Sequence, residues 1–491
     1  MRFLSTLVAS TLGTLLALGA VVLFLFLFFL ALAFSSDQEP AVVPGSVLVL
    51  DLDGPIPERV TDDPLGRAFG GIPPYDLRGV KMALRKAAAD TRIDAVLLRA
   101  HGIQAPWGTL QEIRDELLAF KESGKPLIAS SGEYYSSEQD YFLNSAADSV
   151  FAAPEGLFEF NGFATQIAFF QEALEKLDVD VQVVRAGAYK SAVEPFTRRD
   201  LSPENREQLS ELLDATNSTF MQAVAESRDL TVDALNRIAT EAATLTARGA
   251  YEAGLIDGLR YDDEVMNAIK RRLGEAETED LPTIALRDYV RVSPSRAGLE
   301  LGDEGEIAVV YAEGSIVPGE TEDLYSTAPS IGSETFAEAM RAARESDRTD
   351  AVVVRVNSPG GSASASDAMW HAIERTAREK PVVVSMGGVA ASGGYWIATA
   401  ADAIVADPLT ITGSIGVFGV FFDAGGLFEN KLGVTFDGVQ TSPFADMLTG
   451  VTALSEAERT LLEQFIDETY ETFLEKVAAS RNLSVEEVDA I

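Results

Sequence analysis

The chain has 491 residues, which is enough for one to three domains, each large enough to bury a core. It contains no cysteine, which excludes disulfides, cysteine metal sites and a cysteine nucleophile. The net charge of −37 argues against nucleic acid as a partner, because a strongly acidic surface repels phosphates.

The N-terminal stretch is strongly apolar. Residues 4–36 carry no charge, and Leu15–Phe34 is an almost unbroken run of Leu, Val, Phe and Ala. A run of this length spans a bilayer at about 1.5 Å per residue, and it exceeds the roughly 7–15 apolar residues of a secretory signal. We therefore expect residues 1–36 to be an uncleaved membrane anchor. Arg2 on the short side and Asp37 beyond the run place the bulk of the protein outside the cytoplasm.

The rest of the chain contains one pattern twice, at residues 46–262 and 306–491. Each copy opens with a strand and an amphipathic helix, continues through a second helix to a Lys-Pro and a further strand, and later has a long acidic helix. Such alternation predicts parallel strands buried between helices. We expect an α/β fold of two tandem repeats. Residues 263–305 are charged and contain Pro and Gly, which is typical of a linker.

The two copies differ at their C-terminal ends. The first copy continues well beyond its long helix, whereas the second ends soon after it, at Ile491. We therefore expect the C-terminal end of the second repeat to be truncated in this sequence.

A serine in a glycine-rich turn distinguishes the second copy. Val382–Val384 predicts a buried strand, which we expect Gly387–Gly388 to break. Ser392 and Gly393 then lie between this strand and a helical pattern, a place where a substrate backbone approaches closely and a helix N-terminus favours a developing oxyanion. The first copy has Glu138 opposite Ser392. The alternative is an ordinary turn in which the serine caps a helix.

A second glycine turn follows another strand of the same copy. Gly360 and Gly361 end the stretch Asn-Ser-Pro-Gly-Gly and leave bare backbone N–H groups. With the N–H of Gly393 they could form an oxyanion hole with two donors. A simple Pro-Gly turn is the alternative.

A lysine distinguishes the first copy. Lys190 follows a predicted strand in an apolar stretch, opposite Thr441 of the second copy. Burial lowers the pKa of an ammonium towards neutrality, as a general base requires. The alternative is a surface lysine paired with Glu194. Because His101 and His371 lack a catalytic context, a serine nucleophile needs another base, and the complementary losses in the two copies predict a Ser–Lys dyad.

At these residues the chain resembles the signal peptide peptidase A family in its long, duplicated bacterial form, protease IV, within the ClpP/crotonase-like superfamily. The resemblance rests on four motifs: GAYKSAVEPF (187–196), RVNSPGGS (355–362), SMGGVAASGGYW (385–396) and ITGSIGVFG (411–419). It implies that Ser392 is the nucleophile and Lys190 the general base, and that Ser414 orients the lysine. It also implies oxyanion donors at Gly360, Gly361 and Gly393.

The same resemblance implies a serine endopeptidase that hydrolyses cleaved signal peptides and similar apolar peptides through an acyl-enzyme, with no metal or other cofactor. It further implies a homotetramer in the bacterial inner (plasma) membrane, single-pass, with its catalytic domain on the periplasmic or extracytoplasmic side. Two alternatives remain: a non-catalytic membrane scaffold of the same fold, and a crotonase-like acyl-CoA enzyme. The acyl-CoA enzyme requires a basic phosphate site and a catalytic carboxylate, and neither is evident.

Overall fold

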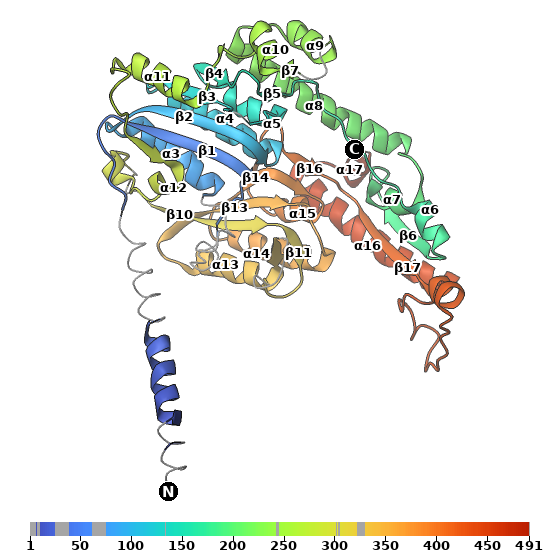
Figure 1. Ribbon diagram of the computed structural model, residues 1–491. Helices are drawn as coiled ribbons and strands as arrows, with labels where there is room; N and C mark the ends of the chain where they lie inside the picture. The colour runs from blue at the N-terminus through green and yellow to red at the C-terminus, as the bar shows by residue number, and fades with distance from the viewer. Residues whose placement is uncertain are drawn as a thin grey trace.

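The computed structural model describes residues 6, 10–24, 39–60, 75–132, 134–241, 245–300, 302, 305–321 and 329–490. Residues 10–24 form a helix that projects away from the rest of the molecule (Figure 1). Within the described ranges, no helix is both long and apolar enough to cross a membrane. The apolar run Leu15–Phe34 continues past residue 24, and its remaining residues lie outside the described ranges.

The first repeat is built on a six-stranded parallel sheet with the order β8-β4-β3-β2-β1-β9. Its strands are β1 (Ser46–Pro55), β2 (Ile93–Gln104), β3 (Leu127–Ser130), β4 (Ser149–Ala152), β8 (Gly258–Leu259) and β9 (Thr283–Ala285). Its helices are α3 (Leu77–Ala89), α4 (Trp107–Lys121), α5 (Glu138–Asn144), α8 (Pro203–Arg228), α9 (Val232–Glu241), α10 (Ala247–Glu252), α11 (Asp262–Leu273) and α12 (Leu286–Tyr289). The stretch 263–305, which the sequence predicts to be a linker, thus adds α11, β9 and α12 to this repeat.

The second repeat has the parallel sheet β10-β13-β14-β15, with β16 also paired to β14. Its strands are β10 (Glu306–Glu313), β13 (Thr349–Ser358), β14 (Val382–Ala391), β15 (Ala403–Val405) and β16 (Ile411–Gly413). Its helices are α13 (Ser333–Glu345), α14 (Ala363–Ala377), α15 (Gly393–Ala398), α16 (Glu456–Arg481) and α17 (Val485–Asp489). Two small pairs complete the repeats: β5 (Leu157–Phe158) with β7 (Leu245–Thr246), and β11 (Ser315–Val317) with β12 (Ser330–Gly332).

The core of the second repeat follows from the alternation of its strands. Val352, Val354 and Val356 of β13 point to one face of the sheet, where they pack against Met340 of α13 and Ile373 of α14. Burial of each such side chain stabilises the fold by roughly 1.5–3 kcal/mol. The α/β architecture predicted from the repeated strand–helix pattern is confirmed.

An arm joins the two repeats outside both sheets. Strand β6 (Asp180–Ala186) of the first repeat pairs antiparallel with β17 (Val417–Asp423) of the second, so that Ala186 faces Val417. Figure 1 shows this ribbon beside the short helices α6 (Gln171–Lys176) and α7 (Glu194–Thr197), with the long helices α8 and α16 nearby. The pairing brings the residues that follow β6 next to those that precede β17, and the functional site forms there.

Candidate active site

Ser392 lies on the turn between β14 and α15. Its φ of 53° is in the left-handed region, which a non-glycine residue adopts only when the surroundings hold it there. The backbone N–H of Ser392 donates to the carbonyl of Gly413 at 2.8 Å, and its own carbonyl accepts from Trp396 at 2.8 Å. A Cβ on Gly394 would lie 2.6 Å from the Ser358 carbonyl oxygen, so this turn requires glycine there. The side chain of Ser392 is thereby presented at the end of a parallel strand.

The prediction that Gly387–Gly388 breaks the strand is wrong. Strand β14 runs through both residues, but its register against β13 shifts, because Val356 pairs with Met386 and Ser358 with Ala390. The side-chain oxygen of Asn357 accepts the N–H of Val389 at 3.1 Å and so fills part of this irregularity. The glycines therefore mark a bulge within the strand.

Lys190 of the first repeat reaches the serine of the second within one chain. Its Nζ lies 3.0 Å from Oγ of Ser392, 2.9 Å from Oγ of Ser414 and 2.9 Å from the Ser414 carbonyl oxygen. The lysine is 6 % exposed, and this burial lowers its pKa to about 8. Gly416 lets the segment after Ser414 lie close to Lys190, since a Cβ there would lie 3.1 Å from Cδ of the lysine. The predicted meeting of amine and hydroxyl is therefore present in the structure.

These three contacts match the valence of a neutral amine. A neutral Lys190 has two N–H donors, which the carbonyl and hydroxyl oxygens of Ser414 can accept, and one lone pair, which then faces the O–H of Ser392. Ser414 also has a left-handed backbone, with a φ of 53°. The arrangement can accept a proton from the serine, which is what nucleophilic attack by a hydroxyl needs.

The alternative of a surface lysine paired with Glu194 is wrong. The carboxylate of Glu194 instead accepts from Asn205 Nδ2 at 2.8 Å and from the N–H of Ser202 at 3.2 Å. Among the described residues, no ion pair joins Lys190 to a carboxylate. Without a counter-charge, burial alone acts on the pKa of the amine.

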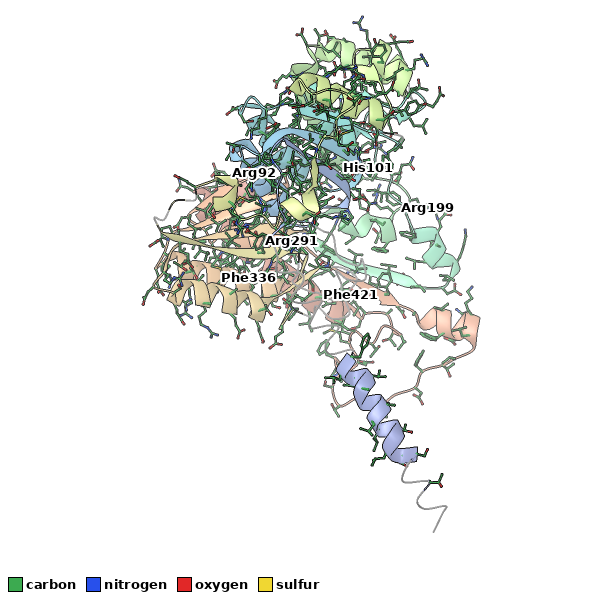
Figure 2. All side chains as sticks on the ribbon, turned by 60° about the vertical axis from the view of Figure 1, so that its left-hand side comes forward. Arg92, His101, Arg199, Arg291, Phe336 and Phe421 are labelled. Atoms are coloured by element: carbon green, nitrogen blue, oxygen red, sulfur yellow. The ribbon has the colours of Figure 1, made fainter. Side chains whose placement is uncertain are left out.

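Neither histidine takes part in this cluster. His101 lies 2.9 Å from Asp51 and stacks on Tyr134 with ring centroids 4.0 Å apart. Figure 2 shows it on the first repeat, away from Phe421 of β17. His371 is exposed on α14, 3.7 Å from Glu374. The serine therefore has a lysine as its neighbouring base.

The glycine turn after β13 has an amide beside Ser392 that no acceptor within the described ranges uses, and this free amide belongs to Gly361. The N–H of Gly360 donates to Oγ of Ser358 at 3.1 Å, so it is already used. The N–H of Ile316 in β11 donates to the Gly360 carbonyl, and the Ile316 carbonyl accepts the N–H of Ser362. The N–H of Gly361, between these two bonds, therefore points away from β11. That nitrogen lies 3.2 Å from the point where a Cβ on Gly393 would stand.

The second free amide is that of Gly393, at the first position of α15, where no intrahelical acceptor exists. A Cβ on Gly360, whose φ is 96°, would lie 2.5 Å from this nitrogen, so the close approach requires glycine. The two amides together can bind an oxyanion. Of the three glycines predicted as donors, Gly361 and Gly393 have amides available, whereas Gly360 shapes the turn.

The sequence reasoning missed Ser358 as a residue of this site. It is fully buried, donates to the Gly314 carbonyl at 2.6 Å and accepts the Gly360 N–H, so it fixes the turn from behind. Its place directly before the Pro-Gly pair was the available signal, because a small hydroxyl side chain commonly bonds the backbone of a turn.

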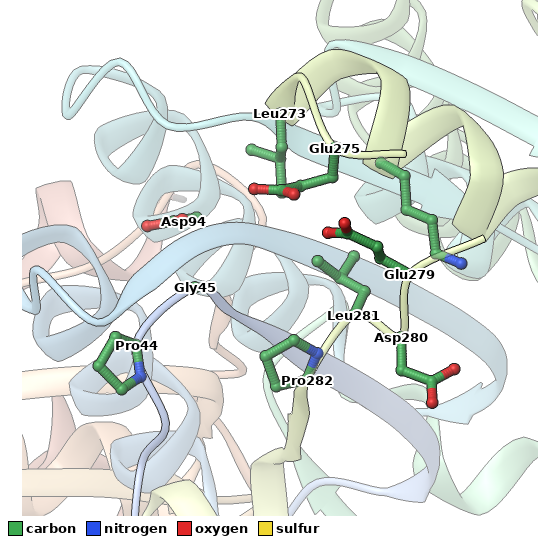
Figure 3. Close-up of a pocket in the computed structure, with 10 residues that line it drawn as sticks. Pro44, Gly45, Asp94, Leu273, Glu275, Glu279, Asp280, Leu281 and Pro282 are labelled. Carbon is green, nitrogen blue, oxygen red and sulfur yellow. The ribbon is translucent and has the colours of Figure 1, made fainter. Parts of the chain in front are cut away.

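A pocket elsewhere in the first repeat does not belong to this site. Its volume is about 160 Å³, and Figure 3 shows Asp94, Glu275, Glu279 and Leu281 around it, near the start of β1 and β2. The serine cluster lies at the opposite, carboxyl ends of strands in the other repeat. Among the described residues, no group of three or more His, Asp or Glu could hold a metal ion.

A serine hydroxyl in contact with a buried amine, at the end of a parallel strand, is an arrangement suited to acyl transfer. Comparison with known proteins places the chain among the serine proteases. The family model for the Clp protease matches residues 327–405, in agreement with a ClpP-like α/β fold. The model for peptidase family S49 matches residues 119–275 and 374–491. The chain belongs to peptidase family S49, which confirms the predicted family.

Three relatives match most of the chain. It is 36 % identical over 470 residues to Protease 4 of Salmonella typhi, covering 90 % of this chain and 72 % of that protein. It is 32 % identical over 489 residues to Protease 4 of Haemophilus influenzae, covering 95 % and 77 %. The chloroplastic serine protease SPPA of Arabidopsis thaliana is 36 % identical over 458 residues, with 91 % and 64 % covered, so the chain spans less than two thirds of that protein.

Proposed function

We propose that this serine protease is a membrane-anchored Ser–Lys endopeptidase that hydrolyses cleaved signal peptides and similar apolar peptides through an acyl-enzyme. The observation that carries the proposal is the 3.0 Å contact between Nζ of Lys190 and Oγ of Ser392. The lowered pKa of the amine, about 8, supports its role as a base near neutral pH.

In the proposed reaction, neutral Lys190 removes the hydroxyl proton of Ser392 as Oγ attacks the carbonyl carbon of the scissile bond. The amides of Gly361 and Gly393 donate to the oxygen that becomes negative. The protonated lysine then gives its proton to the leaving amine, and the C–N bond breaks to leave an ester on Ser392. A water molecule, deprotonated by Lys190, hydrolyses this ester and restores the free serine.

Ser414 is the proposed orienting residue of the base. Its carbonyl and hydroxyl oxygens hold the amine from one side, so that the lone pair is directed at Ser392. Its side chain does not exchange a proton with substrate in this scheme, which makes it a positioning residue.

Apolar peptides are the proposed substrates because the residues beside the dyad are small or apolar. Residues 415–420 carry Ile, Gly, Val and Phe side chains, and the ring of Phe418 lies 6.0 Å from Nζ of Lys190 and is half-exposed. An extended apolar chain would bury surface there without leaving charges unpaired.

The anchor is proposed at residues 1–36, which place the catalytic repeats on the extracytoplasmic side of a bacterial plasma membrane. The uncharged helix at residues 10–24, which projects from the body in Figure 1, supports this proposal. The lipid contact would restrict substrates to peptides that remain in or near the membrane.

A homotetramer is proposed from the internal duplication of the arm. When the two copies are aligned, residues 163–170 of the first copy correspond to β17 of the second. Residues 434–440 of the second copy correspond to β6 of the first. Positive φ values at both Gly162 (85°) and Gly413 (77°) support this alignment. Among the described residues neither segment is paired in a sheet, and Phe436 is 53 % exposed. Pairing of 434–440 with 163–170 of a second copy would be a head-to-tail contact, which can close into a ring.

Hydrolysis of a lipophilic peptide ester tests the proposed activity. The wild type should hydrolyse it, and Ser392→Ala and Lys190→Ala should lose at least about 10³-fold in kcat/KM. Matched controls are Ser210→Ala and Lys176→Ala, which remove an exposed serine and an exposed lysine of the same repeat as Lys190. Equal activity in all five proteins would support a non-catalytic scaffold instead.

A further inference from the structure

A seam of close contacts runs between the two repeats at the bulge of β14. A Cβ on Gly388 would lie 2.0 Å from Cβ of Pro106, which directly precedes α4 of the first repeat. A Cβ on Gly387 would lie 2.6 Å from Oε1 of Glu58, which follows β1. The two glycines therefore provide the space into which the first repeat docks.

A buried arginine lies at the centre of this seam. Nε and Nη2 of Arg355, on β13, each donate to one oxygen of Glu58 at 2.9 Å, which is a bidentate pair. Nη1 donates to the Ser385 hydroxyl at 3.0 Å and the Met386 carbonyl at 3.2 Å, both on β14. Nη2 also bonds to Glu112 of α4. One side chain thus ties β13 and β14 to two elements of the first repeat.

The pair depends on both partners because both are buried. Glu58 is 4 % exposed and Arg355 9 %. A buried ion pair that loses one member leaves a buried charge that is no longer fully compensated, which destabilises the local arrangement. Glu112 cannot fully replace Glu58 as the partner of Arg355, because its Oε2 also lies 2.5 Å from Nζ of Lys81.

The two strands held by Arg355 are the strands that carry the site. Ser358 follows Arg355 on β13 and is followed in turn by the Gly361 amide, while β14 ends one residue before Ser392. A shift of β13 against β14 would change the position of the Gly361 amide relative to both Ser392 and the Gly393 amide, which follow β14. Lys190 contacts Ser414, which follows β16, and lies beside the ladder of β6 and β17. Because β16 pairs with Val389–Ala391 of β14, Ser414 should keep its place relative to Ser392 when β13 shifts.

We propose that Glu58 is a positioning residue of the peptidase: through Arg355 it braces β13 against β14, and so sets the Gly361 amide relative to Ser392 and the Gly393 amide. This inference rests on the proposed function. It assigns the Gly-Gly pair of the motif SMGGVAASGG to docking of the first repeat, and it predicts that the serine site of one repeat needs the other repeat for more than its lysine.

The test measures the rate at which a peptidyl phosphonate diphenyl ester labels Ser392 in the full chain, as a function of pH. Oγ of Ser392 forms a bond to the phosphorus of this probe as Lys190 takes the hydroxyl proton, and the bond from phosphorus to one phenoxide breaks. The phenoxide leaves, and the phosphoryl oxygen occupies the oxyanion hole. Glu58→Gln, which keeps shape but removes charge, should lower the second-order labelling rate about 10- to 100-fold, because small misplacements have effects of this size. The pH midpoint should stay at the wild-type value, because Ser414, which contacts Lys190, follows a strand paired with the strand of Ser392.

Two further variants complete the test. Glu58→Asp keeps the charge and should label at a rate between those of the wild type and Glu58→Gln. Glu116→Gln, on the same helix as Glu112, breaks a pair between this buried carboxylate and the exposed Arg85 inside the first repeat and should label at the wild-type rate. Thermal unfolding of each variant accompanies the rates, and rates are taken where the protein is folded.

The inference is overturned if Glu58→Gln unfolds at a lower temperature but labels at the wild-type rate, because Glu58 then only stabilises the fold. It is also overturned if the pH midpoint moves with the rate, since the brace would then act on Lys190. If Glu58→Gln does not fold, Glu58→Asp at the wild-type rate overturns it. Labelling that persists in Ser392→Ala refutes the proposed function instead, so the two failures are distinguishable.

Discussion

Nζ of Lys190 lies 3.0 Å from Oγ of Ser392 although 202 residues separate them in the chain. The antiparallel ladder of β6 and β17 creates this contact, because it joins a strand of each repeat directly beside the site. The duplication thus has a chemical consequence: each repeat alone holds half of the dyad.

The lysine predicts the pH dependence of activity. Because only the neutral amine accepts a proton, and burial lowers its pKa to about 8, kcat/KM should rise with pH and level off above about 8. A pH–rate profile with the peptide ester measures this. A midpoint near 10.4, the ordinary value for lysine, would contradict a buried base.

The same lysine predicts a pH-dependent difference in stability. Below pH 8 both the folded and the unfolded chain hold the proton, and the folded state bears the cost of a buried ammonium. Between pH 8 and 10.5 the unfolded chain binds more protons, so wild-type stability rises with pH from this group. The free energy of unfolding of Lys190→Met should therefore exceed that of the wild type by about 1–3 kcal/mol at pH 7, and this difference should shrink by pH 10. Denaturant unfolding at both pH values measures it; a gap independent of pH would argue against the lowered pKa.

Ser414→Ala should weaken the base without affecting substrate binding. It removes the hydroxyl acceptor of the amine but keeps the carbonyl acceptor, so one hydrogen bond of about 0.5–1.5 kcal/mol is lost. We expect kcat to fall roughly 2- to 10-fold, with KM unchanged. Steady-state kinetics decide this, and a rise in KM alone would assign Ser414 to substrate binding.

Gly360→Ala should impair the oxyanion hole in a folded protein. The new Cβ would lie 2.5 Å from the Gly393 nitrogen and would displace one donor, which typically lowers kcat by about 10²–10³-fold. Gly124→Ala is the matched control, because that glycine also has a positive φ, 77°, but has nothing within 4 Å of its Cβ position. An equal loss of kcat in both variants would mean that backbone strain, rather than the donor, is responsible.

Phe436→Asp should disrupt the proposed assembly. The exposed ring lies in the segment proposed to pair with residues 163–170 of a second copy, and a charge there opposes burial. Light scattering of the detergent-solubilised chain should give a mass several times the 52.6 kDa of the monomer for the wild type and a smaller mass for the variant. Unchanged mass in the variant would place the interface elsewhere.

The repeated α/β architecture could be predicted because the periodic strand and helix patterns are local and occur twice. The dyad could be predicted because a difference between two aligned copies isolates single residues, Ser392 in one and Lys190 in the other. The bulge at Gly387–Gly388 could not be predicted from the sequence, because a pair of glycines occurs both where a strand ends and where a strand carries a bulge. Only the approach of Pro106 and Glu58 from the other repeat distinguishes them.

Other parts of the site had no local signal. The choice of Gly361 over Gly360 as a donor depends on Ser358 and Ile316, which contact the turn from two sides. Glu58 lies 297 residues from Arg355 in the chain, in a stretch without periodicity, so no pattern in the sequence relates them.

Mass spectrometry of the trapped acyl-enzyme tests the central claim most directly. Brief mixing with a lipophilic peptide ester, followed by acid quench and proteolysis, should show the acyl group on the peptide that contains Ser392. The Ser392→Ala chain should carry none, and Lys190→Met should acquire it at least about 10³-fold more slowly. Acylation at another residue, or acylation of Lys190→Met at the wild-type rate, would contradict the account.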